Sequence, residues 1–149
     1  MTRKPWISLP QTTLPYWREE VEVQAIALRS WILLAGSRES EALESARAAA
    51  DREDAVDKHP VTPGEVIPAR ELHADMLLET GDTAGALAQY QAVLAGSPNR
   101  LNALLGAASA AARAGNEALA DSYYETVRAQ TAAGNRERRG LAPAWAAVP

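Results

Sequence analysis

The sequence predicts an all-α fold: a solenoid of about three stacked helical hairpins, six helices in all, with an extended amino-terminal arm and a carboxy-terminal tail. Alanine, the strongest helix former and a poor core filler, is by far the commonest residue, whereas phenylalanine is absent. Apolar residues recur at three- to four-residue spacing, which is typical of helices with one buried face. No segment shows the apolar–polar alternation of a half-buried strand. These observations favour thin, closely packed helices over a sheet.

Length, composition and charge exclude several classes of protein. The 149 residues fit one domain, and 47% hydrophobic with 23% charged residues are ordinary globular values. A net charge of −4 argues against nucleic-acid binding, because phosphates need a basic surface. The absence of cysteine removes disulfides, thiolate metal sites and cysteine catalysis. We expect a cytoplasmic protein without a membrane segment, since residues 31–35 form the longest strongly apolar run and residues 1–15 lack a signal core.

The chain begins with the arm and a first pair of helices. Residues 1–15 carry a proline at every fifth position, which blocks a regular helix and predicts an extended arm. Residues 16–57 predict a first hairpin, whose first helix ends at Gly36 and whose second helix carries a narrow alanine stripe. Residues 57–68 hold three prolines and a glycine, so we expect no helix to cross them.

Four further helices complete the single domain of residues 16–134. The predicted helices are residues 68–80, 83–95, 99–114 and 117–133. Glycine at or just beyond each of their ends is typical of a helix terminus. The four helices form two hairpins, residues 67–100 and residues 101–134. The last segment, residues 135–149, mixes arginine with leucine and tryptophan and predicts a tail.

The second half of the chain repeats with a period of 34 residues. The matched pairs are Gly81 with Gly115, Asp82 with Asn116, Ala86 with Ala120, Tyr90 with Tyr124 and Val93 with Val127. Glycine followed by Asp or Asn turns the chain between antiparallel helices, and alanine lets the helices approach closely. Tyrosine fills the gap to the next hairpin. The period therefore predicts hairpins that stack to bury their faces.

This pattern resembles the tetratricopeptide repeat, a 34-residue helical hairpin with small, glycine, alanine, aromatic and proline positions in that order. Residues 67–100 match it through Ala74, Leu77, Gly81, Ala86, Tyr90 and Pro98. Residues 101–134 match it through Leu104, Ala108, Gly115, Ala120 and Tyr124, and residues 16–57 look like a degenerate copy. The segments 16–24, 52–82 and 97–116 also resemble the carboxy-terminal region of longer bacterial tetratricopeptide-repeat proteins of unassigned function. The resemblance implies a repeat scaffold and supplies no activity.

The sequence departs from the family at three kinds of position. Arg70 stands where the family has an aromatic residue, His73 where it has leucine, and Ala132 where proline is common. The stacked fold nevertheless predicts a core from the repeat positions. The predicted core residues are Ala42, Leu77, Ala86, Tyr90, Leu104, Ala108, Ala120 and Tyr124.

The first helix of each hairpin in such a stack lines the concave face, which predicts a binding groove. The predicted groove residues, at helical spacing on two helices, are Glu71, Asp75, Leu78, Glu79, Asn102, Leu105, Ser109 and Arg113. Some tetratricopeptide domains hold a peptide's terminal carboxylate with Lys, Asn and Arg on these helices. Glu71 and Asp75 occupy the places of Lys and Asn, so a neutral or basic segment suits this groove better. The alternative is that both acids merely solubilise an exposed helix.

The two histidines and the acidic run of residues 51–57 allow a second interpretation. His59, His73 and a carboxylate have the chemistry of a small-ligand, metal or acid–base site. We favour a structural role, in which His73 is partly buried and hydrogen-bonded to the preceding helix or loop, and the acids form a solvated face. We therefore expect no metal, no cofactor and no catalytic residue.

The loop of residues 57–68 is longer than the usual connection between stacked hairpins. Long ordered loops are often functional, so its polar residues are candidate contacts: Lys58, His59, Thr62 and Glu65. The alternative is that Val61, Val66 and Ile67 plug a gap between the first hairpin and the regular repeats.

The function predicted from these features is a non-enzymatic module that binds a protein or peptide on its concave face. The alternatives are a small-ligand or metal site near His59 and His73, and a structural end-cap of a larger assembly. We also expect a homodimer, with the first helix and the arm of residues 1–15 in its interface. The first helix carries more apolar surface than an alanine-rich neighbour can cover, and closed two-fold dimers are the commonest outcome for self-complementary patches.

Overall fold

The computed structural model describes residues 15–56, 67–134 and 140–146, and within these ranges it is all-helical, without a β-strand. The helices are α1 (Pro15–Ala35), α2 (Glu39–Asp54), α3 (Ala69–Thr80), α4 (Thr83–Gly96), α5 (Leu101–Arg113), α6 (Glu117–Thr131) and α7 (Ala142–Trp145). The predicted all-α fold class is confirmed. The six predicted helices correspond to α1–α6, with ends that differ by no more than three residues.

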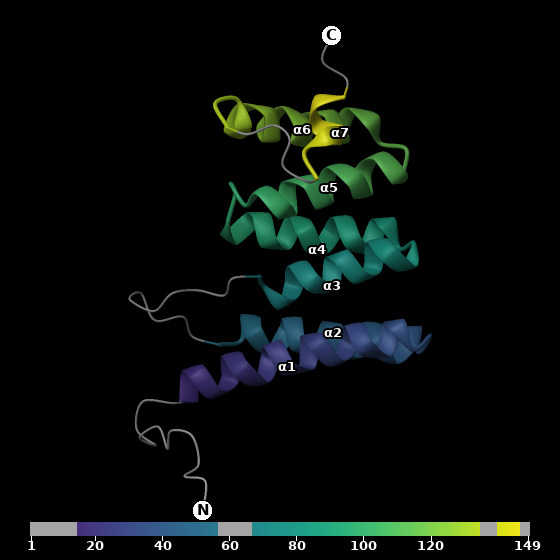
Figure 1. Ribbon diagram of the computed structural model, residues 1–149, viewed down its shortest axis with the longest axis vertical. Coiled ribbons are helices and arrows are strands. Elements are labelled where there is room, and N and C mark those ends of the chain that lie inside the picture. The colour runs from purple at the N-terminus through teal and green to yellow at the C-terminus, as the bar shows by residue number, and fades with distance from the viewer. Residues whose placement is uncertain (1–14, 57–66, 135–139, 147–149) are drawn as a thin grey trace, which may run out of the picture.

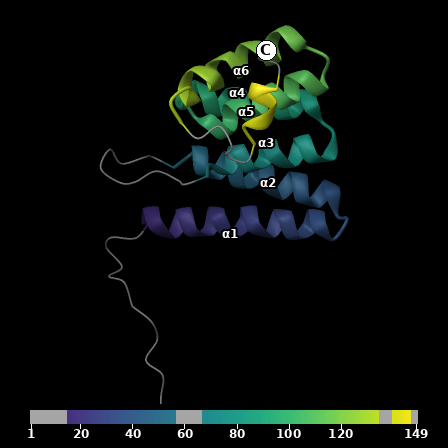
Figure 2. The same cartoon turned by 45° about the horizontal axis from the view of Figure 1, so that its top comes forward.

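The helices form a stack of antiparallel hairpins, α1–α2, α3–α4 and α5–α6. Each helix packs against the next one in the chain, and α3 also contacts both α1 and α5. The first helices of the three hairpins therefore share one side of the stack. Figures 1 and 2 show the hairpins in chain order, with α1 at one end and α6 and α7 at the other. None of the helices in the described ranges combines the length and apolar character that a membrane span needs.

The turns within the two regular hairpins use the residues that the repeat predicts. Gly81 and Gly115 have φ angles of 94° and 78°, in the left-handed region that favours glycine. Asp82 and Asn116 follow them, and their side chains accept hydrogen bonds from the amides of Gly85 (2.9 Å) and Leu119 (3.2 Å). Each pair thus ends one helix and caps the next, which explains why the pair recurs.

The predicted core is largely confirmed. Seven of its residues are buried, from Ala42 at 0% exposure to Leu77 at 8%, whereas Tyr124 is only half-buried. Tyr90 is the largest fully buried side chain, and its ring lies against the backbone of Gly106 in the next hairpin. A Cβ atom at position 106 would lie within 3.0 Å of the ring. Gly106 therefore sets the close approach of α5 to α4.

The two ends of the stack differ. Residues 140–146, which we expected to be a simple tail, form a turn and α7 over α5 and α6. Leu141 and Ala144 are buried against Leu104 and Val127. Arg128 holds this segment through a 3.0 Å hydrogen bond from its Nη1 to the carbonyl of Ala144. At the other end of the stack, the outer side of α1 remains exposed.

Candidate functional site

The eight predicted groove residues lie on the two neighbouring helices α3 and α5, and they differ in exposure. Glu79, Asn102 and Arg113 are exposed, four others are half-buried, and Glu71 is buried. The half-buried residues are Asp75, Leu78, Leu105 and Ser109. The structure thus brings the predicted residues onto adjacent helices, and most of them keep some exposure to solvent.

Glu71 joins two hairpins. Its side chain is 2% exposed and forms an ion pair with Arg100, the residue that immediately precedes α5. The pair is charge-assisted and involves both carboxylate oxygens of Glu71, with a second contact of 3.3 Å from Arg100 Nη2. The interpretation that Glu71 solubilises an exposed helix is wrong, because its side chain is buried and Arg100, at the start of α5, covers it.

Asp75 is held by Tyr90, the tyrosine at the repeat position of its own hairpin. The Tyr90 hydroxyl donates a 2.5 Å hydrogen bond to Asp75 Oδ1. Burial raises the pKa of the Asp75 carboxyl, and the nearby Glu71 carboxylate raises it further against the opposing effect of the Tyr90 hydrogen bond. Burial also raises the pKa of the Tyr90 hydroxyl, and the hydrogen bond to Asp75 raises it further. The hydroxyl therefore stays protonated and remains a donor.

The predicted groove is more open to solvent at the carboxy-terminal ends of α3 and α5. Arg113 Nη1 donates a 3.0 Å hydrogen bond to the carbonyl of Leu78, which ties α5 to α3. Glu79 is exposed and forms no ion pair with any described residue. Leu105, by contrast, packs into the cluster that α7 covers. The side chains of this face that a binding partner can contact are therefore Glu79, Arg113 and the exposed parts of Asp75 and Leu78.

His73 is buried, as its place at a leucine position predicts, with an exposure of 5%. The expected hydrogen bond to a neighbouring element is not seen at Nδ1, which is buried without a partner among the described residues. Burial lowers the pKa of the imidazole, and the positive charge of Arg70 lowers it further. Lys58, His59, Thr62 and Glu65 lie outside the described residues. Within the described ranges, no group of three His, Cys, Asp or Glu side chains could hold a metal ion.

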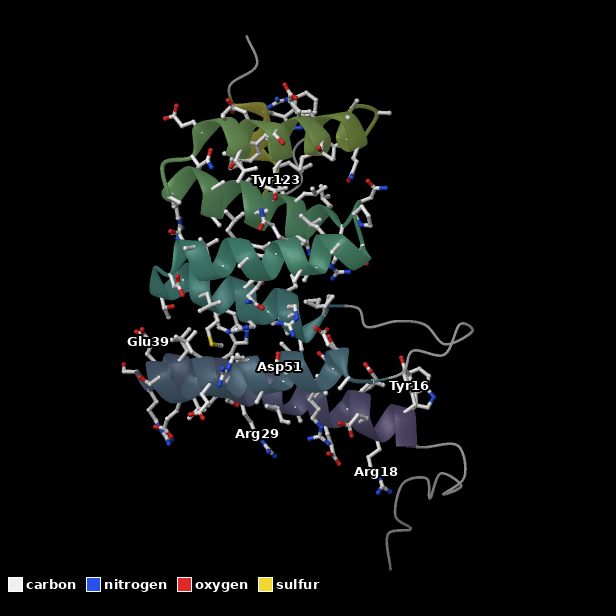
Figure 3. The ribbon with its side chains drawn as sticks, turned by 180° about the vertical axis from the view of Figure 1, so that it is seen from behind. Tyr16, Arg18, Arg29, Glu39, Asp51 and Tyr123 are labelled. Atoms are coloured by element: carbon white, nitrogen blue, oxygen red, sulfur yellow. The ribbon has the colours of Figure 1, made fainter. Side chains whose placement is uncertain are left out.

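The acidic run at the end of α2 is exposed at Asp51 and Asp54, as expected of a solvated face, but it also binds the beginning of α3, and Glu53 is buried. Asp51 and Asp54 accept from Arg70 at 2.8 and 2.6 Å, and Figure 3 shows Asp51 on the side of α2 that faces α3. Glu53 is 1% exposed and accepts a 2.6 Å hydrogen bond from the amide of Ala69. Pro68 precedes that amide and has no capping side chain, so a distant carboxylate satisfies the first turn of α3.

A cavity of about 360 Å³ lies where α2, α3 and α4 meet. Its lining combines charged, small and apolar residues: Asp54, Pro68, Arg70, Ala92, Val93, Gly96 and Ser97. No local sequence pattern predicts this cavity, because its walls come from three separate elements. His73 is not among the lining residues, and the Arg70 guanidinium is already bonded to Asp51, Asp54 and Gln89.

Comparison with known proteins identifies no relative. No known protein family matches the chain, and neither a curated protein nor a solved structure matches it.

Proposed function

We propose that the chain is a non-enzymatic interaction module that binds an extended, neutral or basic protein segment along α3 and α5. The observation that carries the proposal is the placement of the eight groove residues. They come from two adjacent helices of the stack, and all but Glu71 are exposed or half-buried. A stack of hairpins offers an extended surface of this kind, which suits a segment of chain better than a small substrate.

The resemblance to the tetratricopeptide repeat supports the same function. Domains of that family use the first helices of their hairpins as a binding face, and α3 and α5 are the first helices of the two regular hairpins. The carboxylate-clamp chemistry found in some of these domains does not fit, since Asp75 takes the place of a neutral or basic anchor. Glu71 cannot act as a positive anchor either, because it is an acid and is already paired with Arg100.

The charged side chains on α3 predict which kind of partner segment binds most tightly. Glu79 is an exposed carboxylate, and Asp75 is a half-buried one that faces the same pair of helices. Opposite charges steer a partner and select it against others, so segments rich in lysine or arginine are favoured over acidic ones. Arg113 supplies one basic contact at the same end, which sets the direction of a segment with mixed charge.

The test is binding of fluorescent peptide libraries of matched length, one rich in Lys and Arg and one rich in Asp and Glu. We expect the basic library to bind more tightly, and Glu79→Lys to weaken that binding several-fold, because the variant replaces an attractive exposed charge with a repulsive one. Glu125→Lys, at an exposed position of α6, makes the same charge change elsewhere and is the matched control. Equal binding of both libraries, or equal effects of the two variants, contradicts the proposal.

A second candidate is a small-ligand site, and the cavity beside Asp54 and Arg70 favours it. Its volume of about 360 Å³ falls at the small end of ligand pockets. Thermal-shift screening with small metabolites and divalent metals, on the parent and on Ala92→Trp, which would narrow the cavity, separates this candidate from peptide binding. If neither peptides nor small ligands bind and the chain self-associates, the third alternative, an end-cap of a larger assembly, is favoured.

A further inference from the structure

The outer side of α1 carries an apolar stripe, which we define as Trp17, Val21, Leu28 and Ile32. These side chains are 43%, 68%, 64% and 63% exposed. Elsewhere in the described ranges, Ile67 is the one other large apolar side chain that is exposed, at 39%. Figure 3 shows that Arg18 and Arg29, which flank the stripe, project from α1 away from the other helices. We infer that the stripe is the two-fold interface of a homodimer, in which two α1 helices pack antiparallel.

The positions in the stripe have the symmetry that such a dimer needs. They lie at equal distances on either side of a point between Gln24 and Ala25. A two-fold axis through that point places Trp17 of one copy opposite Ile32 of the other, and Val21 opposite Leu28. Every member of the stripe therefore meets an apolar partner. A self-complementary patch of this kind is what an isologous interface requires.

The size of the stripe fits a reversible dimer. From their exposed fractions, its side chains offer about 400 Å² of apolar surface in each copy, within the range of patches that mark interaction sites. Two copies together bury roughly 800 Å² through these side chains alone, and the flanking residues bring the total towards the ~1,200 Å² of small stable interfaces. We therefore expect dissociation in the micromolar range rather than an obligate dimer.

The other end of the stack shows how this chain covers an apolar end within one copy. There, Leu141 and Ala144 are buried over α5 and α6, and Trp145 is half-buried. The stripe on α1 has no such cover among the described residues. Residues 1–14 also include apolar residues and are an alternative cover for the stripe. A single segment of chain, however, does not require a stripe with two-fold symmetry.

The charges beside the stripe supply no net attraction in this arrangement. Antiparallel pairing brings Arg29 of one copy within about 3 Å along the axis of both Arg18 and Glu22 of the other, at 1.5 Å per residue. Glu22 is already paired with Arg52 of its own copy at 2.5 Å, so it adds little attraction across the axis, and association rests on apolar contact. We expect the dimer to be little affected by salt, in contrast to an interface built on ion pairs.

The first experiment is sedimentation equilibrium of the full chain over roughly 1–100 µM, the range in which a micromolar dimer dissociates. We expect a monomer–dimer equilibrium, and Leu28→Glu should raise the dissociation constant by about tenfold or more. Leu28 is exposed in the monomer, so this variant keeps its fold, which circular dichroism verifies. Ala88→Glu, at an exposed position of α4, is the matched control and should dimerise like the parent.

The second experiment fixes the direction of the helices and uses the absence of cysteine from the chain. Ala25→Cys lies beside the proposed axis, so oxidation or a short bismaleimide should join two copies covalently. Ala35→Cys is exposed near the end of α1, and its two copies would be about 30 Å apart in the antiparallel pair. We expect cross-linking of Ala25→Cys, its loss when Leu28→Glu is added, and none for Ala35→Cys.

Each alternative occupant predicts a different result. A monomer up to ~100 µM overturns the proposal and leaves residues 1–14 or another protein as the cover of the stripe. A dimer that Leu28→Glu does not weaken overturns it as well, since the interface then lies elsewhere. Equal cross-linking of Ala25→Cys and Ala35→Cys would show a parallel pair and contradict the two-fold register.

Discussion

Gly106→Ala is expected to destabilise the protein, although alanine normally stabilises the interior of a helix relative to glycine by about 1 kcal/mol. The reason is the contact between hairpins. An added Cβ atom would lie closer than 3.0 Å to Cζ, Cε1 and Cε2 of Tyr90. Tyr90 is 1% exposed and its hydroxyl is bonded to Asp75, so the ring cannot move aside freely.

The expected magnitude is the difference between two effects. Overpacking in a core costs typically 1–3 kcal/mol, and here the strain opposes the gain in helix propensity. Because the added atom would lie this close to three ring atoms, we take the upper part of that range, about 2–3 kcal/mol, and expect a net loss of about 1–2 kcal/mol, or roughly 2–8 °C in the melting temperature of a domain of this size. Gly96→Ala is the matched control. A Cβ atom there meets nothing within 4 Å, so that variant should be neutral or slightly stabilised.

A double-mutant cycle with Tyr90→Leu tests the cause directly. Leucine lacks the outer ring atoms, so Gly106→Ala should become neutral or stabilising in the Tyr90→Leu background. The assay is urea unfolding of the parent, both single variants and the double variant, followed by circular dichroism. The reasoning is refuted if Gly106→Ala is as stable as the parent, or if its cost is the same with tyrosine and with leucine at position 90.

Three further predictions concern the buried polar groups. Arg100→Met should lower the free energy of unfolding by about 2–4 kcal/mol, because it leaves Glu71 buried without its ion pair. An unchanged midpoint in urea unfolding would contradict a stabilising role for this ion pair. Asp75→Asn should be at least as stable as the parent at neutral pH, since the pKa of Asp75 in the folded state lies above its ordinary value of 3.8 and the ionised form is penalised. That advantage should shrink as the pH falls through the folded pKa towards 3.8, and an advantage that grows with acidity opposes this account. Glu53→Ala should lower the free energy of unfolding by about 1–2 kcal/mol and speed hydrogen exchange at the Ala69 amide, as the loss of a helix cap does. Unchanged exchange at that amide would argue against Glu53 as the cap of α3.

Local sequence signals were sufficient for the helices. The glycine–aspartate and glycine–asparagine pairs, spaced by one repeat, predicted the turns that Gly81 and Gly115 make. Alanine at repeat positions predicted close helix packing, which burial of Ala86 and Ala120 confirms. The fold class could be predicted because each signal acts within one hairpin.

Contacts between hairpins could not be predicted in the same way. Glu71 follows the exposed-face spacing of its helix, and its burial depends on Arg100, the residue that immediately precedes α5 of the next hairpin. Glu53 looked like one of several solvated acids, yet it caps a helix across an intervening loop. Gly106 did leave a signal, because glycine inside a helix is unfavourable without a reason in packing. The short α7 has only four residues, too few for a periodic pattern.

The central claim, that α3 and α5 form the binding face, is tested most directly by amide chemical shifts of the full chain during titration with a basic peptide. We expect the largest shifts at Glu79, Asn102, Ser109 and Arg113, with little change at the control position Glu125. Shifts that instead gather at the cavity residues Asp54, Arg70 and Ser97, or that are absent at saturating peptide, contradict the claim.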